Sequence, residues 1–168
     1  LWATLAQPEL RPGQAINRDA VALAFGNLPA HLRAHLGPGL ADKLLASGDR
    51  ETADVIRGAI DRTSIAPTPA YGMMEAQFHL DEGRFDAAAA ALDDVVAAGD
   101  ASMPDALLQR VEATLARGGA VPSDLIVLLD GLAVQFRGTE TARRMIDAGI
   151  RARASVSLDG TRKPMRAL

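Results

Sequence analysis

The segments LASGDRETADVIRGAI (residues 45–60) and LDEGRFDAAAAALDDV (residues 80–95) share one pattern. Each begins at the end of an apolar stretch, passes through a glycine and one or two charged residues, and enters a second amphipathic stretch. Gly48 and Gly83 are 35 residues apart, and Ala53 and Ala88 repeat that spacing. A glycine that ends one helix shortly before the next helix begins is typical of an αα-hairpin. These two segments predict an all-α fold built from repeated hairpins.

Apolar residues at spacings of three and four extend the pattern along the chain. We expect hairpins at about 38–62, 70–98 and 103–136 and a final helix at 139–154, within a helical repeat domain over residues 1–154 that has about eight or nine helices. Residues 155–168 are expected to form a C-terminal tail. The run LIVLL within residues 121–136 has no clear period, but the length of that segment favours a buried helix, hydrophobic on most sides, over a strand.

Local signals place several helix ends. Asn17 and Asp49 are suitable N-caps. The segment LGPG at residues 36–39 is expected to end a short helix that Pro29 opens, and a new helix is expected to begin near Pro38. Residues 1–6 are expected to be the end or the beginning of a helix. In the last helix, Met145, Ile146 and Ile150 are among the residues expected to face inward.

The sizes of the side chains follow the same register as the glycines. The first unit has large, small, large, glycine and alanine residues at Leu40, Ala41, Leu44, Gly48 and Ala53, and the second unit matches at Ala76, Gly83, Phe85, Ala88 and Leu92. This pattern resembles a degenerate tetratricopeptide array, a family with a period of about 34 residues. Ile60, Glu75 and Val95 depart from it, and Pro122 interrupts a third register that places Gly118 correctly. An unrelated helical bundle is the alternative.

The resemblance implies an αα-hairpin array that forms a right-handed solenoid, with the first helix of each hairpin lining a concave face. Carried over residue by residue, that face holds His35, Asp42, Met73, Gln77, Leu80, Asp81, Leu108, Glu112 and Leu115. These side chains are apolar and acidic, with few cations among them. They suit an extended apolar or basic segment of a partner better than a C-terminal carboxylate.

Two functions are compatible with this pattern. The first is a non-catalytic scaffold module that binds a protein or peptide. The second is the superhelical arm of a larger enzyme, such as a cell-wall lytic enzyme; the first residue, Leu1, is not Met, which suggests a fragment or a processed product. The basic tail segment TRKPMRAL is a further candidate for filling the groove of its own chain or of a neighbour in a homodimer, against a tail that packs loosely on the last helix.

Composition limits the other classes of function. Hydrophobic residues make up 48% of the 168 residues but aromatic residues only 4%, so the core must be aliphatic. A net charge of −3 gives no general attraction to nucleic acid or to an anionic membrane, and no apolar run reaches the roughly 20 residues of a membrane span. The chain has 16 arginines, 2 lysines and many alanines, which suggests a bacterial source. The sequence does not distinguish between the cytoplasm and the periplasm as its compartment.

No motif predicts catalysis, a cofactor or a metal. Cysteine is absent, which excludes thiol chemistry. His31 and His35 are one helical turn apart, but a zinc site needs a third protein ligand, and no residue lies at a spacing typical of one. GPGLADK at residues 37–43 lacks the Gly-Lys-Ser/Thr end of a phosphate-binding loop. The adjacent Asp93 and Asp94 point about 100° apart on a helix, so they are expected to belong to a solvated face.

Overall fold

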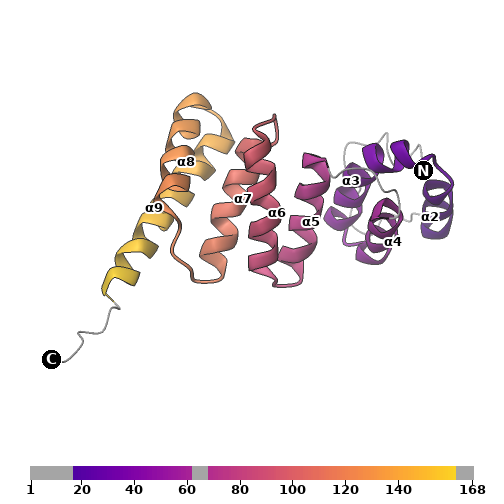
Figure 1. The fold of residues 1–168 in the computed structure, drawn as a ribbon, viewed down its shortest axis with the longest axis horizontal. Helices are drawn as coiled ribbons and strands as arrows, with labels where there is room; N and C mark the ends of the chain where they lie inside the picture. The colour runs from indigo at the N-terminus through magenta and orange to yellow at the C-terminus, as the bar shows by residue number, and fades with distance from the viewer. Residues whose placement is uncertain (1–16, 62–67, 162–168) are drawn as a thin grey trace. The chain divides into compact units, whose positions relative to one another are not determined.

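The computed structural model describes residues 17–61 and 68–161, with side chains up to residue 156, and within them it contains α-helices and no strand. Consecutive helices pack against one another, which confirms the all-α hairpin array (Figure 1). The helices are α2 (Arg18–Gly26), α3 (Ala30–Ala46), α4 (Arg50–Asp61), α5 (Pro69–Asp81), α6 (Phe85–Ala98), α7 (Met103–Ala116), α8 (Ser123–Gln135) and α9 (Glu140–Thr161). The chain divides into two units, Leu1–Met74 and Glu75–Leu168, with the boundary inside α5.

The turns that close α3, α5 and α7 have the same geometry at intervals of 35 residues. A glycine with positive φ stands in each turn: Gly48 (83°), Gly83 (70°) and Gly118 (74°). Its N–H donates to a leucine carbonyl three residues back, and the next N–H donates to the carbonyl five residues back, at 2.8–3.0 Å. This is a Schellman motif, and only glycine adopts its left-handed position without steric cost. The 35-residue spacing in the sequence is therefore a structural repeat.

The third turn is followed by a longer connection than the first two. One residue separates the glycine from the next helix at Gly48 and at Gly83, whereas α8 begins only at Ser123, five residues after Gly118. Pro122 stands immediately before α8, where its missing N–H costs nothing because the first helical N–H groups have no helical partner. The interruption expected at Pro122 is therefore confined to the loop, and the α7/α8 hairpin still forms.

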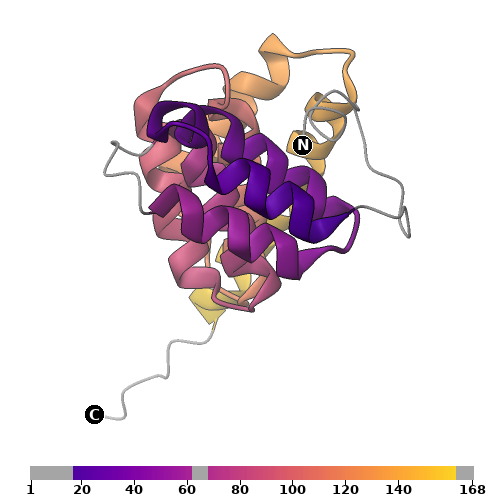
Figure 2. The ribbon, with the colours of Figure 1, turned by 90° about the vertical axis from the view of Figure 1, so that its right-hand side faces the viewer.

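The first unit is built around α4, which packs against both α2 and α3 (Figure 2). The core between α2, α3 and α4 is aliphatic except for Phe25, and its buried hydrophobic members are Val21, Phe25, Leu40, Ala41, Leu44, Ala53, Ile56, Ala59 and Ile60. Asp49 begins α4 as expected, since its carboxylate accepts a hydrogen bond from the N–H of Thr52 at 3.3 Å. Asn17 caps α2 in the same way through the N–H of Ala20 at 3.0 Å.

The expected break at residues 36–39 is wrong. Helix α3 continues through Gly37, Pro38 and Gly39 to Ala46, so the first hairpin begins at Ala30 and not near residue 38. Gly37 and Pro38 are buried, and a β-carbon on Gly37 would lie 2.4 Å from the Cδ1 atom of Ile60. Close packing on α2 and α4 thus holds the helix together where local propensity favours a turn.

The second unit has an aliphatic core that α7 shares with α8 and α9. Its members are Leu107, Leu108, Val111, Val121, Ile126, Leu129, Leu132, Ala133, Met145, Ala148 and Ala152. Two ion pairs also tie α7 to α6, which runs antiparallel to it (Figure 1): Arg110 with Asp93, and Arg117 with Asp86. Asp93 is exposed, as the sequence predicts, and it also links the two helices. Ala88 is fully buried on α6, as its small size predicts.

The last two helices depart from the sequence-based predictions. Residues 123–135 form a helix, but Val127 and Val134 are exposed, so this helix is not buried on most sides. In α9, Met145 faces the core as expected, whereas Ile146 and Ile150 are 53% and 61% exposed. Among the described helices only α7 and α9 pack on α8, and only α7 and α8 on α9, so the outer sides of both helices stay uncovered.

Helix α9 also extends to Thr161, so the predicted tail from residue 155 begins seven residues too early. The helix predicted at residues 1–6, and the tail segment from residue 162 onward, lie outside the described residues. None of the helices in the described ranges is both long enough and apolar enough to cross a bilayer.

Candidate functional site

The residues predicted to line a concave face divide between the two units. His35, Asp42 and Met73 belong to the first unit, and Gln77, Leu80, Asp81, Leu108, Glu112 and Leu115 belong to the second. His35, Asp42 and Asp81 are exposed, and Met73, Gln77, Leu80, Glu112 and Leu115 are half-buried. Leu108 is buried in the core and is not available to a partner, which corrects that part of the prediction.

In the second unit the predicted residues lie among more cations than the sequence indicated. Glu112 on α7 lies 3.5 Å from the guanidinium of Arg144 and 3.9 Å from that of Arg151, both on α9. The amide of Gln77 donates to Asp81 on the same helix at 2.8 Å. Asp81 and Glu112 therefore already have partners within the chain, and the charge of Glu112 is balanced by two arginines of α9.

His35 and Asp42 lie seven residues apart on the same side of α3. Asp42 is exposed at its surface, but the surrounding protein keeps water from part of its carboxyl group. This burial raises the pKa of Asp42 from 3.8 to about 6. Among the described residues no cation forms a salt bridge with Asp42, so its negative charge opposes folding near neutral pH.

We expect Asp42→Asn to stabilise the chain at pH 7.5 and to leave its stability unchanged near pH 3.5. The native state holds the Asp42 proton more tightly than the unfolded state does, so the free energy of unfolding falls as pH rises from about 4 to about 6. Solvent screens this exposed carboxylate, and we expect a gain below about 1 kcal/mol. Urea denaturation at both pH values measures it, with Asp94→Asn on α6 as the control. Equal gains at both pH values would show that the charge of the Asp42 carboxylate does not cause the effect.

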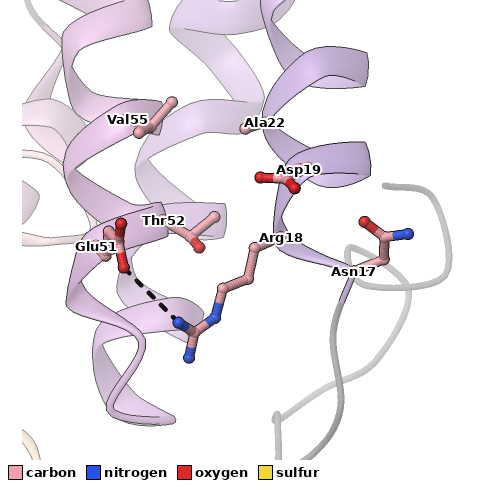
Figure 3. Close-up of a pocket in the computed structure, with 7 residues that line it drawn as sticks. All are labelled: Asn17, Arg18, Asp19, Ala22, Glu51, Thr52 and Val55. Carbon is pink, nitrogen blue, oxygen red and sulfur yellow. Dashed lines mark ion pairs between the residues drawn. The ribbon is translucent and has the colours of Figure 1, made fainter.

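A pocket of about 450 Å³ opens between the first turns of α2 and α4 in the first unit (Figure 3). Both helices begin at the same end of it, and Ala22 and Val55 lie one turn further along each helix. We refer to it as the α2/α4 pocket, and its lining residues are Asn17, Arg18, Asp19, Ala22, Glu51, Thr52 and Val55. One end of the pocket is therefore charged and the other aliphatic.

The cation in the described lining of this pocket is Arg18, and Asp49 holds its side chain in place. The Nε atom of Arg18 lies 3.0 Å from the buried carboxylate of Asp49, whereas its Nη1 atom lies 3.8 Å from Glu51. Asp49 is held in turn by the hydroxyl of Thr52, which donates at 3.0 Å to the same carboxylate oxygen, Oδ2, that Arg18 contacts. Arg18 is thus committed mainly to Asp49, and the exposed carboxylates of Asp19 and Glu51 leave the pocket with excess negative charge.

Exposed aliphatic side chains extend the apolar end of the α2/α4 pocket. Val55, which lines the pocket, is 49% exposed on α4, and Leu23, which lies outside the lining but one turn after Asp19 on the same side of α2, is 69% exposed. A lysine or arginine side chain matches the two ends of the pocket, because it has a charged head group and an aliphatic stem. The pocket can therefore take a basic side chain, with its head group at Asp19 and Glu51, its stem along Ala22 and Val55, and an adjacent apolar residue on Leu23.

The N-caps beside this pocket are predictable from the sequence, whereas the pocket itself is not. Asn17 and Asp49 were recognisable as N-caps, yet the packing of α2 beside α4 is a tertiary contact with no local signal. The one available signal was Val55, a β-branched residue outside the buried stripe of Ala53, Ile56 and Ile60. Within the residues that the structure describes, no three histidine or acidic side chains are grouped so that they could hold a metal ion.

Comparison with known proteins identifies no family for this chain. No protein-family model, no curated protein and no solved structure matches the chain.

Proposed function

We propose that this chain is a non-catalytic module of stacked helical hairpins that binds a segment of a partner protein. The observation that carries the proposal is the α2/α4 pocket, where the exposed carboxylates of Asp19 and Glu51 outnumber Arg18, the one cation in its described lining, and stand beside exposed aliphatic side chains. Exposed apolar residues that lie together and are rimmed by polar groups mark sites of interaction with other proteins. The partner segment presents a basic residue together with apolar residues.

The repeated turns support a tetratricopeptide-like interpretation of this module. Three Schellman turns at a spacing of 35 residues, with leucine at the same position of each, are what a helical-hairpin repeat requires. Tetratricopeptide arrays commonly serve as scaffolds for assembly. In our proposal the hairpins act as a rigid support, and the affinity comes from aliphatic contact while the carboxylates orient the partner.

The direct test is the binding of a fluorescein-labelled helical peptide that has one arginine followed by leucines three and seven residues later. We expect Asp19→Asn combined with Glu51→Gln to weaken binding by at least about tenfold, because both carboxylates are lost while size is kept. Fluorescence anisotropy measures the dissociation constant, and Asp94→Asn, a matched neutralisation on α6, should leave it unchanged.

The same assay discriminates the pocket from the concave face that the sequence predicted. Binding that survives neutralisation of the pocket but is lost on changing both Gln77 and Glu112 to Lys would move the site to the second unit. A peptide in which glutamine replaces the arginine provides the complementary control, since it should bind the native chain as weakly as the arginine peptide binds the neutralised pocket.

A further inference from the structure

An exposed face of α9 has the chemistry that the α2/α4 pocket requires. Arg143, Ile146 and Ile150 are spaced by three and four residues, so they lie along one side of the helix. Both isoleucines are more than half exposed, and the Arg143 side chain is among the most exposed in the described ion pairs. Among the described residues, no other helix packs over this side of α9. We call these three residues the α9 face.

We propose that the α9 face of one copy of this chain docks on the α2/α4 pocket of a second copy. This inference rests on the proposed function and names its partner. The guanidinium of Arg143 meets Asp19 and Glu51, and the two isoleucines cover Val55 and Leu23. A helix that inserts a basic and two aliphatic residues at spacings of three and four is a recurrent mode of recognition between proteins.

Charge complementarity favours a second copy over an acidic partner. Residues 140–156 of α9, whose side chains are described, carry four arginines against Glu140 and Asp147, whereas the lining of the α2/α4 pocket carries two carboxylates against Arg18. Arg143 is paired only with Glu140, one turn away on the same exposed helix surface, at 2.8 Å, among the described residues. Such a pair contributes little to stability, so Arg143 can exchange it for the pocket carboxylates at small cost.

Docking of two different surfaces has a consequence for assembly. Each copy offers one pocket and one α9 face, so the contact is heterologous, and it leads to a closed ring or to an open chain of copies. A two-fold contact between two α9 faces would instead bring Arg143 and Ile150 of both copies into one interface and would not involve the first unit.

The test is the self-association of the full chain, followed by sedimentation velocity over a concentration series. We expect the native chain to associate. Val55→Lys on the pocket and Ile150→Glu on the α9 face should each weaken association by at least about tenfold, because each places a like charge opposite its partner surface. Both positions are exposed, so the fold is retained. An equimolar mixture of the two variants should form a one-to-one complex, since one native pocket and one native α9 face remain.

Leu128→Glu is the matched control, since Leu128 is an exposed leucine on α8 that belongs to neither of the two surfaces. It should leave association unchanged. A native chain that stays monomeric at every concentration would overturn the inference, and so would association that Val55→Lys leaves intact. If the chain is monomeric while the arginine peptide still binds the pocket, the inference fails and the proposed function stands.

Discussion

Gly37→Ala should lower the free energy of unfolding by about 3 kcal/mol, although it replaces a glycine inside a helix with the best helix former. The added β-carbon would lie 2.4 Å from Cδ1 and 2.6 Å from Cγ1 of Ile60, and 2.8 Å from the Cζ atom of Phe25. All three distances are far below van der Waals contact. Since Phe25 and Ile60 are themselves buried, neither side chain can move away without disturbing α2 and α4.

Gly39→Ala, two residues further along the same helix, is the matched control. A β-carbon there would have no atom within 4 Å, and the residue is exposed. We expect this variant to stabilise the chain by about 0.5–1 kcal/mol, because alanine reduces the conformational freedom of the unfolded chain. Urea denaturation of both variants measures the difference. A loss of stability at Gly39 equal to that at Gly37 would show that the cost comes from the helix backbone and not from packing.

These two glycines also show why the course of α3 could not be predicted from the sequence. The segment LGPG has the composition of a turn, and local propensity alone predicts that the helix ends there. The structure continues the helix because Gly37 allows α3 to lie close against Ile60 and Phe25, which come from α4 and α2. By contrast, the turns at Gly48, Gly83 and Gly118 were accessible to sequence reasoning, because a Schellman motif is closed by hydrogen bonds within six residues.

The same distinction separates the predictable from the unpredictable part of the site. The N-caps at Asn17 and Asp49 are local features, and their hydrogen bonds formed as expected. Which side of an amphipathic helix is covered depends on the helices that stack on it, and α8 and α9 have uncovered outer sides in the described structure. For this reason periodicity predicts Ile146 and Ile150 in the core, and the aliphatic residues available to a partner cannot be identified from periodicity alone.

Asp49→Ala should lower the free energy of unfolding by about 2 kcal/mol and should also weaken binding at the α2/α4 pocket. The buried carboxylate caps α4 through the N–H of Thr52 at 3.3 Å, accepts the Thr52 hydroxyl at 3.0 Å, and holds Arg18 at 3.0 Å. A lost N-cap alone costs about 1 kcal/mol, and the unpaired Thr52 hydroxyl adds to this cost. Chemical denaturation measures the loss of stability.

The effect of Asp49 on binding can be separated from its effect on stability with Asp49→Asn. Asparagine keeps an oxygen that can cap α4, so we expect it to retain more of the stability. It removes the charge that holds Arg18, whose Nη1 atom is already within 3.8 Å of Glu51. Arg18 then turns toward Glu51 and neutralises a carboxylate that the basic peptide needs. Asp49→Asn should therefore weaken peptide binding as much as Asp49→Ala does, and an asparagine variant that binds with native affinity would show that Asp49 acts only as a cap.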